Sequence, residues 1–320
     1  MTEFGYTLLC EQTPPKQLVA DLVDAEQAGF GFSVISDHYF PWIEEQGHSP
    51  YAWSVLGAAA QATERIPLMT FVTCPIMRYH PAVVAQKAAT MGVLSDGRFT
   101  LGVGAGENLN EHVVGRGWPS VRVRHEMLGE ALEIITALFS GEYVDYEGDY
   151  FTVDSAKLYD LPENPVPVAV AASGQESVEI AAELGDGLIA TEPRAELVSS
   201  FEEAGGEGPK YGQVPVCYDQ DADAARERAG RLWRWGVAGW KVMAELPGPV
   251  NFAAHSRFVR PEDVVAGVPC GPDVEPYVEA VRAFTDAGFT HVALCQIGAE
   301  HQKEFVTWAE RQLLPALREL

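Results

Sequence analysis

Short hydrophobic runs alternate along the chain with longer segments in which apolar residues recur every three or four positions. Eight of the short runs are apolar at nearly every position, a pattern typical of parallel strands that are buried on both faces. These predicted strands are 4–9, 32–36, 68–74, 99–104, 166–172, 187–190, 214–218 and 291–297.

The longer segments between the strands predict helices. The first has apolar residues at helical spacing over 18–28 and stops before Gly29, a residue suited to a helix C-cap. A second starts at Pro81, because proline is favoured in the first turn. Further helices are predicted at 125–139, 175–184 and 301–317.

Eight strands alternating with helices predict an α/β fold, a (β/α)8 TIM barrel that spans residues 1–320 as a single domain. A doubly wound sheet is the alternative, but glycines at 102, 104 and 106 lack the spacing of its dinucleotide motif. Two segments exceed a minimal barrel. Residues 141–158 predict a hairpin, and 235–273, rich in glycine, proline and aromatic residues, predict a lid-like insertion.

The composition narrows the class of protein. The 320 residues are 47% hydrophobic and 21% charged, which excludes a disordered, collagen-like or small disulfide-rich chain. Acidic residues outnumber basic ones by 46 to 22, giving a net charge of −24. Because nucleic acid and anionic membranes need a basic surface, neither is expected as a partner. A locally positive pocket for a small anion stays open.

The cysteines and the N-terminal segment indicate a cytoplasmic protein. Five cysteines, an odd number without a CxxC motif, predict reduced residues, three of them within apolar runs. The sequence has no signal-peptide pattern and no apolar run of about 18 residues, so we expect no membrane span.

Candidate chemistry follows the predicted strands, because a barrel gathers its reactive groups at the carboxyl ends of its strands. Asp37 and His38 follow the second strand, and histidine moves protons near neutral pH. Neighbouring strand residues point to opposite faces, so both face the site only if the strand has already ended. Otherwise Asp37 caps a loop and His38 is structural.

Other polar segments leave two interpretations open. The glycines of 102–106 allow close backbone approach by a flat ligand or an anion, or else form a tightly packed turn. Glu107 and Glu111 are acids of the site or solvated loop charges. Ser173 and Gly174 open a helix that holds a phosphate, or they form an ordinary N-cap. The histidines have no metal-ligand spacing, so no metal is predicted.

Several segments together resemble one family. They are GYTLLCEQTPP, VISDHYFPW, VTCPIMRYHPAVVAQKAATM, GRFTLGVGAGENLNEH and the hairpin GEYVDYEGDYF. These segments are similar to the luciferase-like flavin and deazaflavin superfamily, and most of all to its branch of F420-dependent glucose-6-phosphate dehydrogenases. The resemblance covers about residues 4–195 well and the C-terminal third weakly.

The resemblance implies that coenzyme F420 binds with its ring in the barrel mouth. His38 matches the base that takes a hydroxyl proton, Trp42 a residue that stabilises the substrate as hydride leaves, and Glu107 the partner acid at the ring. Whether His38 or Glu107 deprotonates the substrate stays open. The positions that match cofactor contacts are Asp37, Phe71, Val72, Cys74, Ala105, Gly106, Asn110, Ala172, Ser173 and Gly174.

The resemblance further implies a non-prolyl cis peptide bond between Phe71 and Val72 and a cofactor phosphate on the turn at 172–174. Arg78 and, less directly, Lys87 are candidate cations for the anionic part of the cofactor. The cofactor supplies hydride chemistry, and the protein supplies orientation and electrostatics.

The matching substrate positions are Glu11, Thr191 and Arg194. Arg194 stands where the sugar-phosphate enzymes have lysine, and the later basic positions fall at 253–255 and 265–267, which have no lysine or arginine, although Arg257 and Arg260 are nearby. Glucose 6-phosphate is therefore not the expected substrate. Another sugar phosphate and an uncharged alcohol stay open.

The expected function is an F420-dependent dehydrogenase that transfers hydride between an alcohol-type substrate and the deazaflavin. One alternative is an FMN-dependent luciferase-like monooxygenase. The other is a non-catalytic F420-binding protein, which has no need for an acid, a base and an indole at one barrel mouth. The family leads us to expect a homodimer that acts on a small molecule.

Overall fold

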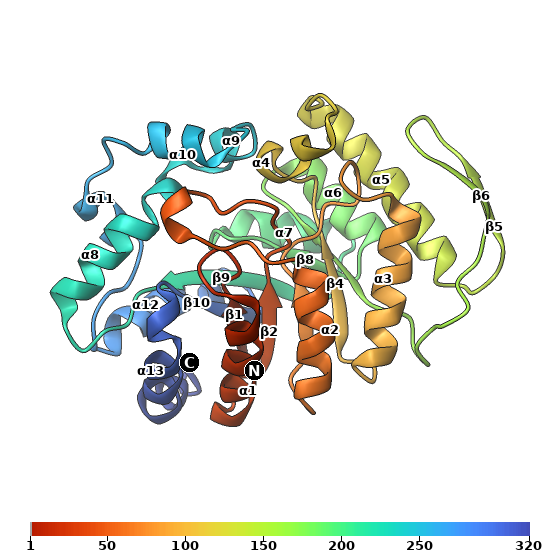
Figure 1. The fold of residues 1–320 in the computed structure, drawn as a ribbon. Helices are drawn as coiled ribbons and strands as arrows, with labels where there is room; N and C mark the ends of the chain where they lie inside the picture. Colours follow the sequence, from red (N-terminus) through yellow and green to blue (C-terminus); the bar gives the residue numbers. More distant parts are fainter. Residues whose placement is uncertain (1) are drawn as a thin grey trace.

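A closed barrel of eight parallel strands forms the centre of the computed structural model, which describes residues 2–320 (Figure 1). Around the barrel the strands follow the order β1, β10, β9, β8, β7, β4, β3, β2. Closure confirms the TIM barrel and excludes the doubly wound alternative. The strands are β1 Glu3–Leu8, β2 Phe32–Ile35, β3 Leu68–Thr70, β4 Phe99–Val103, β7 Val168–Ala171, β8 Gly187–Ile189, β9 Lys210–Val216 and β10 His291–Gln296.

All eight predicted strands are present, and two of them differ from their predicted ranges by four residues at one end. β3 stops at Thr70, the cis peptide bond between Phe71 and Val72 follows, and Thr73 then pairs with Val103 as an isolated bridge. β9 begins at Lys210, four residues before the predicted run. Its early residues alternate in polarity, so they lack the continuous apolar pattern on which the prediction relied.

The predicted helices are present, and the structure adds four long helices, besides several short ones, that the pattern did not identify. Gly29 ends α1 with a φ of 89°, as its C-cap position required, and α6 has the predicted bounds. The predicted helices correspond to α1 Pro15–Ala28, α3 Pro81–Leu94, α5 Val121–Leu138, α6 Gln175–Leu184, and α13 Gln302–Trp308 with α14 Leu314–Leu317. The additional long helices are α2 Ala52–Ala62, α7 Ala195–Glu203, α8 Ala222–Leu232 and α12 Glu275–Asp286.

The hairpin insertion is attached to the outside of one helix. Its strands, β5 Val144–Glu147 and β6 Thr152–Ala156, pair antiparallel beside α5 at the edge of the molecule (Figure 1). The carboxylate of Glu130 on α5 accepts hydrogen bonds from the backbone N–H groups of Asp149, Tyr150 and Phe151. The hairpin is therefore joined to α5 by a carboxylate acceptor and to the core by buried Phe151 and Val153.

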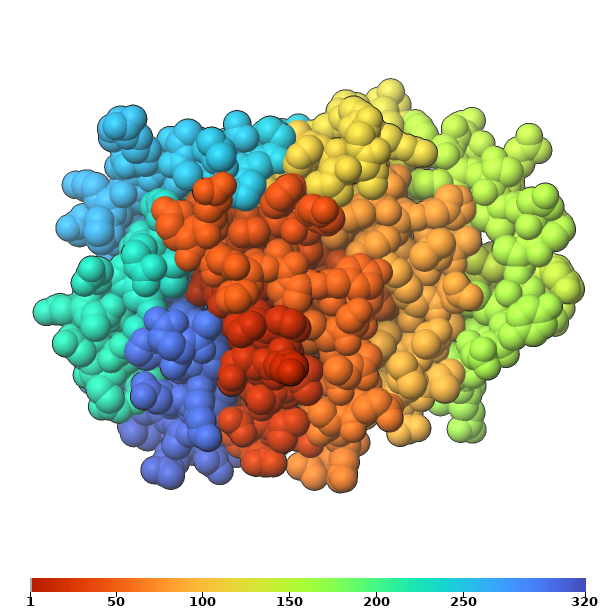
Figure 2. All heavy atoms as spheres, viewed as in Figure 1, coloured from red at the N-terminus to blue at the C-terminus, as the bar shows by residue number. Residues whose placement is uncertain are grey.

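The lid-like insertion consists of short helices, of which the first ones lie at the carboxyl ends of the strands beside α4, Asn108–Glu111, and the last packs against α8 (Figures 1 and 2). The backbone N–H of Asn108 donates to the carbonyl of Ala244 at 2.9 Å, which fixes this contact. The lid helices are the 3-10 turn η3 Arg234–Ala238, α9 Trp240–Met243, α10 Pro249–His255 and α11 Pro261–Val265.

The interior of the barrel is filled toward its amino end and lined by small residues at the other. Phe32 packs edge-on against Tyr211 and His291, with ring centroids 6.0 and 5.4 Å apart. Near the carboxyl ends the small residues Gly104 and Ala171 face Val72. The barrel is therefore closed at one end, and its mouth is the place where a ligand can approach.

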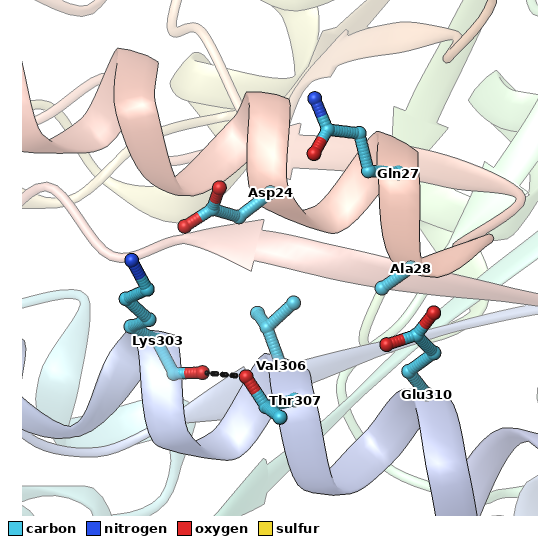
Figure 3. Close-up of a pocket in the computed structure, with 7 residues that line it drawn as sticks. All are labelled: Asp24, Gln27, Ala28, Lys303, Val306, Thr307 and Glu310. Carbon is cyan, nitrogen blue, oxygen red and sulfur yellow. Dashed lines mark hydrogen bonds between the residues drawn. The ribbon is translucent and has the colours of Figure 1, made fainter.

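A surface hollow lies between α1 and the C-terminal helical stretch, on the outer helical layer (Figure 3). It sits at the last turn of α1, which leads into the amino end of β2. Its one internal hydrogen bond, from Thr307 Oγ1 to the carbonyl of Lys303, only stabilises a helix. We therefore look for the functional site at the barrel mouth instead.

Asp21 makes the stability of the barrel wall depend on pH. Its side chain is buried in α1, Gln17 donates to Oδ1 at 2.7 Å, and Oδ2 has no partner. Burial raises the pKa of Asp21 to about 6, so the folded state holds this proton more tightly than the unfolded chain. The resulting stabilisation is fully present below pH 3.8 and is lost as the pH rises through about 6.

We therefore expect Asp21→Asn to raise the free energy of unfolding at pH 8 by about 1–3 kcal/mol relative to the native chain. The difference should shrink toward pH 4, where the native carboxyl is protonated. Urea unfolding at both pH values measures it. A constant difference between the two values would show that Asp21 does not titrate in this range.

Candidate active site

Polar residues meet in the loops after β1, β2 and β4. Because β2 ends at Ile35, Asp37 and His38 lie in a loop and strand alternation does not separate them. Glu11 follows β1, and Glu107 occupies the N-cap position of α4 after β4. The structure thus brings Glu11, Asp37 and His38 to one end of the barrel, as the strand order predicts.

Asp37 is an anchor for its loop. Its Oδ2 accepts hydrogen bonds from Trp53 Nε1 at 2.9 Å and Thr73 Oγ1 at 2.8 Å. Its Oδ1 accepts from Arg78 Nη2 at 3.2 Å and Tyr79 Oη at 3.1 Å. Both carboxylate oxygens are therefore engaged by the protein, and the residue fixes the loop that carries His38.

His38 combines an oriented ring with a free nitrogen. Its Nδ1 lies 3.2 Å from the carbonyl oxygen of Phe40 and 3.2 Å from Oε1 of Glu11. Because both neighbours are acceptors, we infer that Nδ1 carries the ring proton of the neutral side chain. No residue that the structure describes hydrogen-bonds Nε2, which leaves this atom available to accept a proton.

Trp42 lies inside an aromatic enclosure that the sequence did not reveal. Its indole stacks on Trp235 with a centroid separation of 4.2 Å and an interplanar angle of 8°. Phe252 and Trp240 approach it at 5.1 and 6.3 Å, and His38 contacts it edge-on at 4.8 Å. The lid was predicted from composition, but the pairing of its aromatic residues with Trp42 has no signature in sequence spacing.

Asn110 connects the two candidate acid–base groups. Its Oδ1 accepts from the backbone N–H of Tyr39 at 2.8 Å, beside His38, and its Nδ2 donates to Glu107 Oε2 at 3.3 Å. Both ends of this side chain are therefore used within the protein. Asn110 fixes the position of Glu107 relative to the His38 loop.

The glycines after β4 are required by the packing of the protein itself. A Cβ at Gly102 would overlap the carbonyl oxygen of Thr70, and one at Gly104 would lie 2.9 Å from Val72 Cγ2. Gly106 has a φ of 77°, and a Cβ there would overlap the buried thiol of Cys74. Close packing thus explains these glycines, and Ala105 lies half-buried between the last two.

The turn after β7 differs in detail from the expected phosphate cradle. Ala172 is buried, and the N–H groups of Ser173 and Gly174 both donate to Ser177 Oγ, at 3.2 and 3.3 Å. The unpaired amides nearest to this turn are therefore those of the first turn of α6. A Cβ at Gly174 would meet no protein atom, so the turn is open on that side.

Thr191 and Arg194, the expected substrate positions after β8, are both engaged. Trp240 Nε1 donates to Thr191 Oγ1 at 2.7 Å. Arg194 Nη1 donates to the carbonyl of Ser173 at 3.0 Å, and its Nε pairs with Glu196 at 2.7 Å. Arg194 therefore lies beside the turn that was expected to hold the cofactor phosphate.

The other candidate cations are occupied or lie on the surface. The side chain of Arg78 is buried between Asp37 and Glu111. Burial raises the pKa of Glu111 to about 7. Lys87 points its ammonium at the ring of Tyr79, 3.2 Å from the centroid, and burial lowers its pKa to about 8. Arg260 pairs with Asp263 and Arg257 lies over Phe258, and both pairs are at the surface of the lid.

Two negative findings concern residues 2–320. In this range no group of three or more histidine, cysteine, aspartate or glutamate side chains is arranged to hold a metal ion. None of the helices described is both long and apolar enough to cross a membrane.

Comparison with known proteins gives consistent matches. The family model described as luciferase-like monooxygenase matches residues 2–291. An F420-dependent glucose-6-phosphate dehydrogenase of Beutenbergia cavernae is 36% identical over 99% of this chain and 98% of its own. An F420-dependent hydroxymycolic acid dehydrogenase of Mycobacterium tuberculosis is 39% identical over 89% of this chain and 80% of its own.

The fold also matches a solved structure along its whole length. An F420-dependent secondary alcohol dehydrogenase in complex with an F420-acetone adduct superposes with a TM-score of 0.91 at 31% identity. The match covers 99% of each chain. Barrel, insertions and lid are therefore all represented in a structure of known cofactor.

Proposed function

The chain belongs to the family of luciferase-like monooxygenases, and from this premise we propose that it is a coenzyme F420-dependent oxidoreductase. The proposed reaction transfers a hydride between an alcohol-type substrate and the deazaflavin, so the enzyme is a dehydrogenase that acts on CH–OH donors. The observation that carries the proposal is the pair of Glu11 and His38 at the barrel mouth, with Nε2 of His38 free to accept a proton.

Unpaired polar atoms at the mouth suit a polar, flat cofactor. Oε2 of Glu11, Nε2 of Gln12, Oγ1 of Thr13 and Oγ of Ser36 are buried without a protein partner. A buried polar group left unpaired costs about 1–3 kcal/mol, so such a group is normally matched by a ligand or an ordered water. These donors and acceptors follow β1 and β2, where the resemblance places the ring, and F420 therefore fits the residues present.

The residues of the chain divide the work of alcohol oxidation. When bound, F420 supplies a hydride acceptor and does not activate oxygen. Nε2 of His38 is placed to take the hydroxyl proton, and the carboxylate of Glu11, 3.2 Å from Nδ1, stabilises the charged ring that results. Trp42 limits the orientation of His38 by its edge-on contact, and Asn110 holds Glu107 nearby as the partner acid.

Binding of F420 and FMN decides the cofactor. We expect fluorescence titration to give micromolar or tighter binding of F420 and at least about tenfold weaker binding of FMN. Micromolar FMN binding without F420 binding would instead favour the oxygen-using alternative.

A glycine variant makes this measurement specific to the site. Gly174→Ala adds a methyl group that no protein atom contacts, at a residue with extended backbone, φ −162°. If the cofactor approaches this turn, the variant should bind F420 about tenfold more weakly while its unfolding stays nearly unchanged. Gly57→Ala on α2 also meets no protein atom within 4 Å and serves as the matched control.

The single-domain organisation, a cytoplasmic location and a homodimer belong to the same proposal. Uncharged faces on α2 and α3 support the dimer: α2 has no charged residue, and Val83, Val93 and Leu94 of α3 are exposed in a chain of net charge −24. Apolar and uncharged surface of this kind is typical of interfaces between subunits. The molar mass in solution distinguishes a dimer from a monomer.

A further inference from the structure

The lid surrounds Trp42 with aromatic and aliphatic side chains. Trp42, Trp235, Phe252 and Met243 are all buried in one cluster with Ile43 from the His38 loop. The edge-on contact between His38 and Trp42 places the proposed proton acceptor directly against this cluster. A substrate whose hydroxyl reaches His38 therefore has its carbon substituents near indole and phenyl rings.

The hydroxyl of Thr191, one of the expected substrate positions, is blocked by the same lid. Thr191 Oγ1 accepts the indole N–H of Trp240 at 2.7 Å, and Trp240 also contacts Trp42. This hydrogen bond joins the lid to the loop after β8. A phosphate bound by Thr191 would have to displace Trp240.

Positive charge is lacking where a substrate phosphate would need it. Arg194 is engaged by Glu196 and the carbonyl of Ser173. Arg234, at the start of the lid, pairs with Glu45. Lys241, which follows Trp240 in the sequence, is exposed. Burying a phosphate dianion among aromatic rings without a paired cation is strongly unfavourable.

We propose that the lid selects an uncharged alcohol with an apolar substituent and excludes phosphorylated sugars, with Trp240 as a specificity-determining residue. This inference rests on the proposed function, because it assigns the substrate class of the same site. Apolar substituents gain by contact with Trp240, the half-buried aromatic ring beside Trp42, whereas a phosphate gains no partner there.

The first test measures turnover. Reduction of F420 by glucose 6-phosphate is compared with reduction by uncharged secondary alcohols of increasing apolar size, such as 2-propanol, cyclohexanol and 2-octanol. We expect kcat/KM to rise with apolar size, and the best alcohol to exceed glucose 6-phosphate by about 100-fold or more. Equal or better turnover of glucose 6-phosphate would overturn the inference and leave the proposed function intact.

The second test needs neither F420 nor turnover. Cyclohexanone, inorganic phosphate and glucose 6-phosphate are titrated separately into the cofactor-free protein while tryptophan fluorescence is recorded. A saturable change with cyclohexanone alone supports the aromatic site, and a saturable change with glucose 6-phosphate that inorganic phosphate does not reproduce contradicts it. If F420 fails to bind at all, the proposed function is wrong, and this titration still decides the character of the site.

Two substitutions separate the ring of Trp240 from its N–H group. Trp240→Phe keeps an aromatic surface and releases Thr191, so the KM for the best alcohol should stay within about threefold. Trp240→Ala also removes the surface, and the KM should rise about tenfold or more with a smaller change in kcat. Equal KM values in the native chain and both variants would show that Trp240 does not contact the substrate.

Discussion

Replacing His38 with alanine is expected to lower turnover by about two to four powers of ten while F420 affinity stays within about tenfold. The imidazole is the group at the barrel mouth with an unpaired acceptor nitrogen, and Glu11 is placed to stabilise it when it is protonated. Single-turnover rates measured with saturating alcohol report this loss separately from binding.

Two further variants make the His38 result interpretable. Tyr39→Phe alters the neighbouring, exposed side chain without touching the ring of His38 and serves as the control. Glu107→Gln keeps the shape of the partner acid and is expected to reduce turnover by a similar factor. Near-normal turnover in both His38→Ala and Glu107→Gln would assign them structural roles and favour a non-catalytic binding protein.

Asp37→Ala is expected to lower the free energy of unfolding by about 3–5 kcal/mol. The change removes the acceptor for Trp53, Thr73 and Tyr79. It leaves the buried guanidinium of Arg78 with one carboxylate, Glu111, and with the main-chain carbonyl of residue 37. Unfolding in urea, followed by circular dichroism, measures the loss as a lower midpoint at an unchanged slope.

Asp37→Asn provides the matched comparison for this anchor. The carbonyl oxygen of the asparagine side chain can still accept hydrogen bonds from Trp53 and Thr73. Its NH2 group is itself a donor, so it cannot accept the hydrogen bonds that Arg78 and Tyr79 give to the native carboxylate. We therefore expect a smaller loss than in Asp37→Ala. If alanine costs less than about 1 kcal/mol, the carboxylate is not the anchor of the His38 loop.

The strand pattern determined most of the barrel because its strands are buried on both faces and carry continuous apolar runs. The run at 68–74 overestimated β3 because Phe71 and Val72 are apolar but only half-buried and leave the ladder, which Thr73 rejoins as an isolated bridge to Val103. The helix α2 was missed since its eleven residues are mostly alanine and other small or apolar residues, which gives a weak contrast between faces.

The site was predictable where it depends on strand order and not where it depends on side-chain direction. Glu11 and His38 follow neighbouring strands, so their proximity follows from the fold. Arg78 follows a strand as well, yet its guanidinium is paired with the carboxylates of Asp37 and Glu111 within the protein. The contacts of Trp42 with Trp235 and Trp240 join segments about 190 residues apart, a separation over which no local pattern operates.

The two insertions are attached by different balances of forces, so they should not respond alike to cooling. The hairpin combines buried Phe151 and Val153 with hydrogen bonds from its backbone to the carboxylate of Glu130 on α5. The lid is held by stacked aromatic rings, and apolar association weakens on cooling. Cooling should therefore loosen the lid before the hairpin, so that limited proteolysis in the cold would cut first within residues 234–265.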